Sequence, residues 1–325
     1  MPFIRNEFAT KSRGGTELMC DRIDSFLSLA CPDAFNQVDI YPSRIRNFDS
    51  TRNSIYYLHD LPQDPECAHL AEDGGARFDC LVFVSNWQQQ VFNQHHRLSP
   101  RVRQIVIPNA IVPIPCSPNK WSNSNEPIRL IYHTTPHRGL ELLNWWIQHR
   151  LGAFQTSIAR AIAIDVFSSF NIYGLSERDE PYQRMFDELR ANSNTAYHGS
   201  VSNDTVRAAL EHSHVFAYPC IWPETFCLAA VEAISSQTVV VTSNLAALPE
   251  ITGGLEVMYP HSQDKNVHAS SFALSLERLI SMIDSGAIRF QSLATLQKKR
   301  VDLIYNWNYV QDSWYELITG LAAAR

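Results

Sequence analysis

The sequence lacks the features that would place the protein in a membrane, in the secretory pathway or in a metal-stabilised class. No apolar run reaches the roughly 18 residues that a membrane-spanning helix requires, and the start of the chain contains no signal-peptide core. The seven cysteines are an odd number without a CxxC pair, which disfavours a disulfide framework and a structural zinc site. We therefore expect a cytoplasmic protein with at most peripheral membrane contact.

An excess of positive charge is also missing. The net charge is −6, and charged residues make up 18% of the sequence. Because a nucleic-acid-binding protein usually presents a basic face, no nucleic acid partner is expected. The densest basic run, Lys298–Arg300, is most simply a solvated helix face, and a weak contact with anionic lipid is the alternative.

What the chain does contain is a regular alternation of strand-like and helix-like segments. This alternation is typical of parallel sheets in α/β domains, and 325 residues suffice for two of them. A stretch rich in proline, serine and asparagine, 112–127, is the best linker. We expect an N-terminal Rossmann-like domain over residues 1–116, with a poor first strand, and a C-terminal one over 117–305. The predicted strands are 39–41, 54–59, 80–85, 103–108, 128–132, 161–167, 196–198, 215–218, 238–242 and 256–259.

The most informative segment is PCIWPETFCLAAVEAISSQT, residues 219–238. Glu224 follows an apolar strand, and Glu232 is predicted about two turns into a helix that begins near Thr225 or Phe226. A second apolar strand comes directly after. In parallel sheets, ligands bind at the carboxyl ends of the strands, where a helix N-terminus can hold a phosphate.

The spacing from Glu224 to Glu232, with its flanking Pro-Glu-Thr-Phe and Glu-Ala, resembles the E-x7-E signature of the retaining GT-B glycosyltransferases of family 4, the group 1 type. The resemblance implies an α/β protein of the GT-B fold, with two Rossmann-like domains whose parallel sheets face each other across a cleft. It also implies that the terminal helix, 306–325, crosses back to the N-terminal domain; packing on its own domain is the alternative.

The resemblance assigns roles to the main candidate residues. Glu224 would contact the donor sugar near the reacting centre, and Glu232 would accept hydrogen bonds from the ribose hydroxyls. Arg138 lies at a helix start after a strand, where a cation suits a diphosphate. It takes the place of the family's lysine; Thr134 and Thr135 stand where an arginine is usual, with His133 and His137 as additional candidates. His59, at the end of a predicted strand, matches a histidine that lines the donor sugar site.

Weaker candidates surround the nucleotide. The glycine pair Gly14 and Gly15 would let backbone N–H groups approach a phosphate, although such a pair is also a common structural turn. Gly174, Gly199 and Val201 match family positions near the nucleotide, and the helix start at Thr225 and Phe226 would add positive charge near the diphosphate. Departures from the family include Cys227 and Gln237, which stand where glycines are common.

The reaction implied is transfer of a sugar from a nucleotide-diphosphate donor to a saccharide, lipid-linked or other hydroxyl acceptor, with retention at the anomeric carbon. Because no DxD motif is present, we expect no metal and no cofactor beyond the donor itself. Two alternatives stay open: a non-hydrolysing sugar-nucleotide epimerase, and a catalytically silent scaffold that binds a nucleotide sugar.

Overall fold

The computed structural model describes residues 2–4, 14–45, 48, 51–117, 120–122, 125–286 and 288–324. The chain divides into two compact units. Unit 1 comprises Met1–Val112 and Ile304–Arg325, and unit 2 comprises Pro113–Leu303. The domain limits expected from the sequence lay after residues 116 and 305.

Unit 1 is built on a four-stranded parallel sheet in the order β1-β2-β3-β4. Where the poor first strand was expected, the described residues 2–4 form a parallel bridge between Phe3 and Ile40. Two backbone hydrogen bonds fix it, from Ile4 N to Ile40 O and from Ile40 N to Pro2 O. The strands are β1 Val38–Pro42, β2 Asn53–Tyr57, β3 Cys80–Phe83 and β4 Arg103–Val106.

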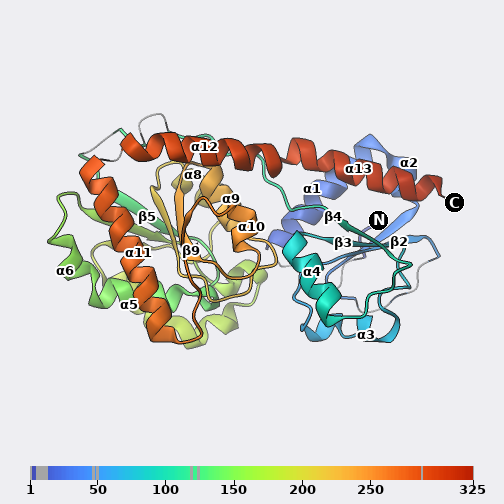
Figure 1. Cartoon of the computed structure of the whole chain (residues 1–325), viewed down its shortest axis with the longest axis horizontal. Coiled ribbons are helices and arrows are strands. Elements are labelled where there is room, and N and C mark those ends of the chain that lie inside the picture. The colour runs from blue at the N-terminus through green and yellow to red at the C-terminus, as the bar shows by residue number, and fades with distance from the viewer. Residues whose placement is uncertain are drawn as a thin grey trace. The chain divides into compact units, whose positions relative to one another are not determined.

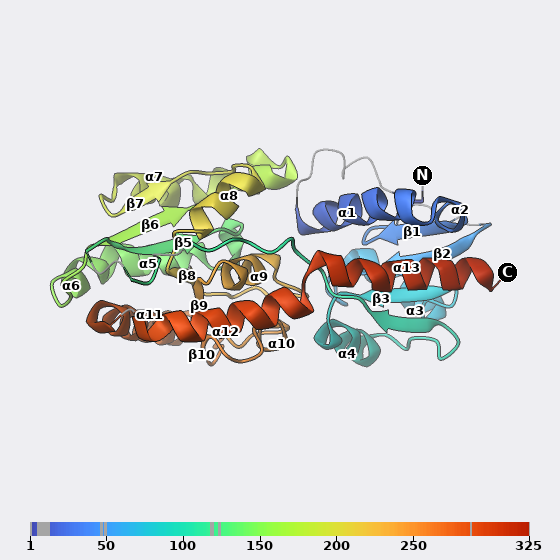
Figure 2. The ribbon, with the colours of Figure 1, turned by 90° about the horizontal axis from the view of Figure 1, so that it is seen from above.

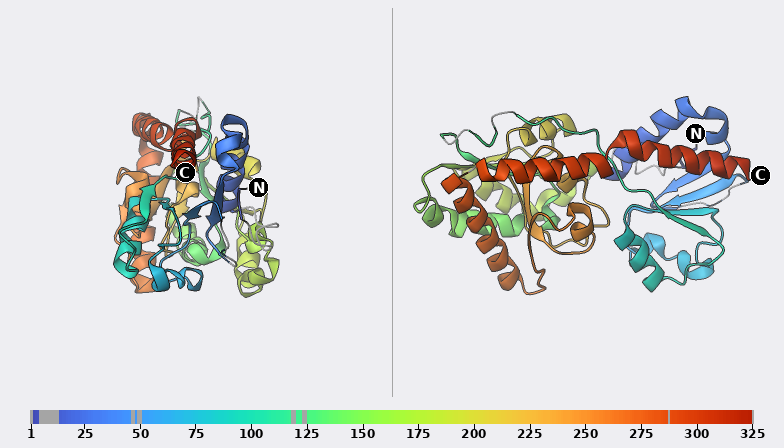
Figure 3. Two further views of the ribbon diagram at one scale, coloured as in Figure 1. Left: turned by 90° about the vertical axis from the view of Figure 1, so that its right-hand side faces the viewer. Right: turned by 45° about the horizontal axis from the view of Figure 1, so that its top comes forward.

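Helices cover both faces of the sheet of unit 1 (Figures 1 and 3). The terminal helix α13 lies beside α1 (Figure 2) and packs on α1, α2 and β1. Trp314 of α13 is fully buried, with its ring centroid 4.9 Å from that of Tyr57, and the Asn53 amide donates to Leu321 O at 2.7 Å. The helices are α1 Gly15–Ala30, α2 Pro32–Phe35 and α13 Trp307–Ala323 on one face, and α3 Leu70–Asp73 and α4 Asn86–His95 on the other.

Unit 2 contains a six-stranded parallel sheet in the order β7-β6-β5-β8-β9-β10. Counted along the chain from its first strand, β5, this order is 3-2-1-4-5-6, so the direction of winding reverses between β5 and β8. Ligands in open α/β sheets bind at such a reversal, beyond the carboxyl ends of the two strands. The strands are β5 Ile128–Tyr132, β6 Ile162–Val166, β7 Thr195–Tyr197, β8 Val215–Tyr218, β9 Val239–Ser243 and β10 Val257–Tyr259.

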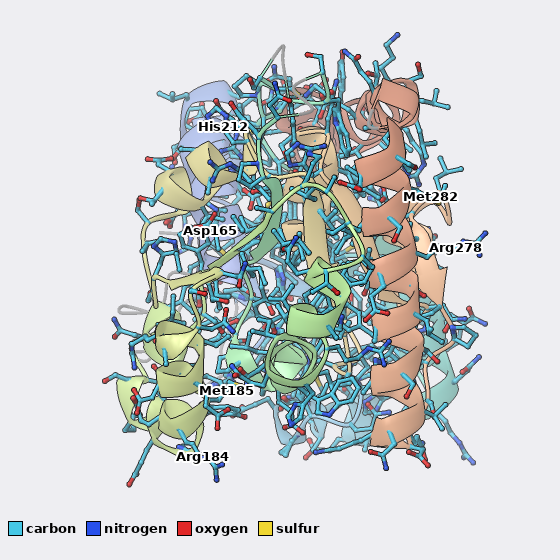
Figure 4. The ribbon with its side chains drawn as sticks, turned by 90° about the vertical axis from the view of Figure 1, so that its left-hand side faces the viewer. Asp165, Arg184, Met185, His212, Arg278 and Met282 are labelled. Atoms are coloured by element: carbon cyan, nitrogen blue, oxygen red, sulfur yellow. The ribbon has the colours of Figure 1, made fainter. Side chains whose placement is uncertain are left out.

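The helices of unit 2 pack in two groups. Helix α11 contacts α5, β9 and β10, while α9 lies between α8 and α10 (Figure 1). Arg278 and Met282 lie on the outer side of α11 (Figure 4), and none of the helices in the described ranges is long and apolar enough to cross a bilayer. The helices are α5 Leu140–His149, α6 Leu151–Gln155, α7 Gln183–Ala191, α8 Asn203–Leu210, α9 Leu228–Ser235, α10 Leu248–Thr252, α11 Lys265–Gly286 and α12 Ile288–Ile304, with short 3-10 turns η3 Pro136–Arg138, η4 Phe170–Tyr173 and η5 Ser176–Tyr182.

The expected linker packs as part of unit 2. The ammonium of Lys120 is buried and donates to Leu210 O, Ser236 O and Thr238 Oγ1 at 2.7–3.0 Å. Trp121 is 2% exposed. The proline-rich composition of residues 112–127 predicted a linker, but the Lys120 ammonium and the Trp121 indole are buried in unit 2.

Candidate functional site

Glu224 lies in the loop between β8 and α9, at the reversal point of the sheet. Helix α9 begins at Leu228, so the prediction of a start near Thr225 or Phe226 was wrong, and Glu232 lies little more than one turn into the helix. Cys227, the residue before α9, has a non-helical backbone, and the Glu224 carbonyl accepts a hydrogen bond from Ala247 N instead of starting a helix.

Arg138 lies at the end of η3, after β5, and is held next to the Glu224 loop by Gly139. The backbone of Gly139 has φ +126°, and a Cβ there would lie 2.1 Å from Pro219 O. Only glycine allows this close approach. The Arg138 carbonyl also accepts a hydrogen bond from Ile221 N at 3.3 Å. The loops that follow β5 and β8 are therefore locked side by side.

The side chains of Arg138 and Glu224 form an ion pair. Arg138 Nη1 lies 2.5 Å from Glu224 Oε1 and 2.6 Å from Oε2. Glu224 is 3% exposed, whereas the Arg138 side chain is 23% exposed. Burial opposes the charge on Arg138, but the Glu224 carboxylate outweighs it and raises the pKa of Arg138 well above its usual value. Tyr218, the last residue of β8, donates its hydroxyl to Glu224 Oε1 at 2.5 Å.

One edge of the Arg138 guanidinium takes no part in the contact with Glu224. Its Nη1 is used by Glu224, whereas the buried Nε makes no hydrogen bond within the described part of the chain. A buried donor without a partner costs about 1–3 kcal/mol, so an acceptor that reached this edge would be bound favourably.

Glu232 is also buried, at 4% exposure, but on the side of α9 that faces α8. Arg207 Nη1 donates to its Oε1 at 3.1 Å, and the Asn203 amide lies 3.3–3.4 Å from both carboxylate oxygens. The two glutamates therefore have separate cationic partners. The role of Glu232 toward a ribose stays a prediction.

The neighbours of Arg138 provide little further charge. His133 follows β5 directly, and burial lowers its pKa to about 3. Burial, together with Arg138 and Arg178, lowers the pKa of His137 to about 4. Both imidazoles are neutral near pH 7, so they can offer hydrogen bonds but no cation. The Thr134 hydroxyl donates to the Tyr132 hydroxyl at 3.1 Å.

The predicted nucleotide-side residues fall around the ends of β6 and β7. Gly174 and Gly199 have left-handed backbones, with φ +69° and +67°, which favour glycine. Gly199 lines a cavity of about 300 Å³, together with the buried Asp179 and with Arg190. Val201 follows this segment. Thr225 and the buried Phe226 lie in the Glu224 loop ahead of α9.

The remaining predicted residues belong to unit 1. Strand β2 ends at Tyr57, so His59 lies in the loop that follows and not within the strand. Its ring packs edge-on against Tyr57 at 4.2 Å, and burial lowers the pKa of His59 to about 3, so the ring is neutral near pH 7. Gly14 and Gly15 are the N-cap and first residue of α1. Their roles at the site stay predictions.

Sequence reasoning missed Tyr218 and Trp222. Tyr218 was taken only as the end of an apolar strand, although a hydroxyl at the last position before a site loop is a usable signal. The Trp222 ring is 40% exposed and lies edge-to-face with His137, at a centroid distance of 4.8 Å.

The departures from family glycines differ in their structural effect. Gln237 adopts φ +63°, the left-handed conformation that glycine adopts without strain. Cys227 has φ −113°, which any residue can adopt.

A second cavity, of about 370 Å³, lies on the sheet face near Asp165 and His212 (Figure 4). Its lining also includes Glu126 and Arg129. No group of three or more potential metal ligands occurs among the residues that the structure describes.

Comparison with solved structures identifies the fold. Sucrose-phosphate synthase from Thermosynechococcus elongatus matches with a TM-score of 0.64 at 16% identity, over 95% of this chain and 79% of that one. HepE from Anabaena, in complex with UDP and glucose, matches with a TM-score of 0.61 at 13% identity, over 83% and 72% of the two chains. The protein has the GT-B fold, which confirms the fold class expected from the sequence.

Comparison of sequences narrows the class further. Residues 168–282 match the family described as Glycosyl transferases group 1; both Glu224 and Glu232 lie within this match, and Arg138 lies outside it. The phosphatidylinositol N-acetylglucosaminyltransferase GPI3 subunit of Saccharomyces cerevisiae is 23% identical over 253 residues, 75% of this chain and 51% of that protein. This part of the chain is thus similar to group 1 glycosyltransferases, and the chain spans 51–60% of the length of the curated relatives that it matches.

Proposed function

We propose that the protein is a retaining glycosyltransferase of the family 4 type, which transfers a sugar from a nucleotide-diphosphate donor to a hydroxyl acceptor without a metal ion. The observation that carries the proposal is the Arg138–Glu224 pair at the reversal point of the sheet of unit 2. A cation and a carboxylate at this position complement the two charges that develop in the transition state. The diphosphate leaving group gains negative charge while the anomeric carbon gains positive charge.

We expect Arg138 to bind Glu224 and the diphosphate of the donor at the same time. Its Nη1 holds Glu224, Nε makes no hydrogen bond within the described residues, and we expect the edge formed by Nε and Nη2 to bind two oxygens of a diphosphate. A guanidinium binds phosphate through two parallel hydrogen bonds in this manner. The contact strengthens as charge grows on the departing oxygens, so it lowers the barrier as well as binding the donor. No metal is needed in this scheme.

Glu224, paired with Arg138, would stabilise the positive charge that develops on the sugar in the transition state. Glu232 would hold the ribose, with the nucleotide lying near Gly199 and Val201. The UDP and glucose bound to HepE favour a UDP-sugar among possible donors. The name of the yeast relative favours a lipid-linked acceptor among the hydroxyl acceptors. We further propose a cytoplasmic location with peripheral membrane contact.

The test is a panel of nucleotide sugars, led by UDP-sugars, incubated with the protein and with candidate acceptors. We expect release of the free nucleoside diphosphate and formation of an α-linked product from an α-linked donor, both unchanged in excess EDTA. Loss of activity on chelation, restored by Mg²⁺ or Mn²⁺, would reject the metal-free scheme. Epimerised donor would identify an epimerase, and binding without turnover would identify a silent scaffold.

A further inference from the structure

Tyr218 makes a contact that the proposed reaction does not yet explain. It is the last residue of β8, its side chain is fully buried, and its hydroxyl donates to Glu224 Oε1 at 2.5 Å. Its ring is fixed on two sides. Phe216 stacks on it with a centroid distance of 5.0 Å and an interplanar angle of 7°, and Tyr132 meets it edge-on at 6.1 Å. This packing fixes the hydroxyl oxygen beside the Glu224 carboxylate.

The second donor matters because Arg138 alone leaves the carboxylate free to pivot. A single nitrogen, Nη1, lies almost equally far from Oε1 and Oε2, so it does not fix the plane of the carboxylate. A hydrogen bond to Oε1 from the sheet beneath removes that freedom.

The tyrosine is also held in the donor form. Burial, with Cys220 and Glu224 nearby, raises the pKa of Tyr218 well above its usual value despite Arg138. The other titratable groups that face the Glu224 carboxylate are Tyr132, Cys220 and Cys227. Burial raises the pKa of each of these three, so they stay neutral near pH 7, and Arg138 is the only cation in this set.

We propose that Tyr218 is a positioning residue for the transfer reaction, which fixes the orientation of the Glu224 carboxylate and stabilises its ionised form. The inference rests on the proposed function of Glu224. It goes beyond that function by assigning a required residue in the strand beneath the site, where no contact with the donor is needed.

The test compares Tyr218→Phe with Tyr259→Phe in the full-length protein. Tyr259 is a matched control because it is also buried, also ends a strand of the same sheet, and also bonds through its hydroxyl, to His268 Nε2 at 3.0 Å. Both variants lose one buried hydrogen bond, so their melting temperatures should fall by similar amounts. Steady-state rates are measured with the best donor of the panel, as a function of pH.

We expect Tyr218→Phe to lower kcat by about tenfold to a hundredfold, the scale of one hydrogen bond to a charged group, with KM for the donor within about twofold of wild type. Because the ionised carboxylate loses a donor, the acid limb of the pH–kcat profile should move to higher pH. Tyr259→Phe should keep the wild-type kcat and the wild-type profile.

The outcomes distinguish the positioning role of Tyr218 from the proposed glycosyltransferase activity. If the wild type turns over a donor and Tyr218→Phe matches Tyr259→Phe in kcat and in pH profile, the positioning role is wrong while the proposed function stands. An unshifted acid limb with a lowered kcat would reduce Tyr218 to a packing role. If the wild type itself turns over no donor and transfers no sugar, the proposed function and this inference fail together.

Discussion

Replacing Arg138 by alanine should destabilise unit 2 as well as weaken its binding of a nucleoside diphosphate. The substitution would leave the Glu224 carboxylate, 3% exposed, with the Tyr218 hydroxyl as its remaining donor among the contacts described above. Removing one partner of a fully buried ion pair costs about 3–5 kcal/mol. Since Arg138 is itself 23% exposed, water can partly replace it, and we expect a loss of about 2–3 kcal/mol.

Scanning calorimetry of the full-length chain measures this loss. A domain of this size loses about 2–4 °C in Tm for each kcal/mol, so the transition of unit 2 should fall by roughly 4–12 °C. The control is Arg184→Ala, because Arg184 projects from α7 (Figure 4) and pairs with Glu188 while 93% exposed. Surface pairs of this kind contribute about 0.5 kcal/mol or less.

Adding Glu224→Ala to Arg138→Ala should restore part of the lost stability, since no buried charge then remains without its partner. If Arg138→Ala has the same Tm as the Arg184→Ala control, or if adding Glu224→Ala lowers Tm further, Arg138 and Glu224 do not stabilise unit 2 as a buried ion pair.

Binding of UDP, measured by titration calorimetry, tests the predicted loss of affinity for a nucleoside diphosphate. Arg138→Lys keeps the charge but loses the planar fork, so it should retain most of the stability and recover only part of the affinity lost in Arg138→Ala. An affinity of Arg138→Ala within about twofold of wild type, or roughly 0.4 kcal/mol, would mean that the diphosphate binds elsewhere.

Three further predictions concern single residues. Glu224→Gln should lower kcat by about two to three orders of magnitude, the scale of one transition-state contact, and near wild-type turnover would exclude a catalytic role. Gly139→Ala should unfold at lower denaturant than wild type because its Cβ would meet Pro219 O at 2.1 Å; by contrast Gly320→Ala, in an open helical position, should gain about 0.5–1 kcal/mol, and equal effects would contradict the packing argument. Burial raises the pKa of Glu256 from 4.5 to about 8, so its protonated form favours the folded state below pH 4.5 and this contribution is lost as pH rises to about 8. Glu256→Gln should therefore gain unfolding free energy relative to wild type across that range in urea titrations, and a difference independent of pH would show that Glu256 does not titrate there.

The strands and helices of both units can be predicted from the amino-acid sequence alone. Strands and helices follow from local patterns, because a buried parallel strand needs a short apolar run and its crossover helix needs a helical period. The predicted strands at 128–132 and 215–218 match β5 and β8, and the others differ from the observed strands only near their ends. The motif with Glu224 and Glu232 is also local, since both residues belong to one strand-loop-helix unit.

Short-range patterns were less reliable where long-range contacts compete. The start of α9 was expected near Thr225 but lies at Leu228, because the loop bonds to Ala247 before the helix begins. The segment around Lys120 reads as a linker, yet its ammonium is drawn into unit 2 by three acceptors from distant parts of the chain.

The assembly of the site depends on contacts between residues that are far apart in the sequence. Arg138 and Glu224 are 86 positions apart in sequence, and they become neighbours because β5 and β8 are adjacent where the winding of the sheet reverses. Gly139 then allows the two loops to touch, and the side-chain alternation of β8 points the Tyr218 hydroxyl at the carboxylate. A sequence specifies such contacts only through the strand order, which depends on the packing of the whole sheet and not on any local pattern.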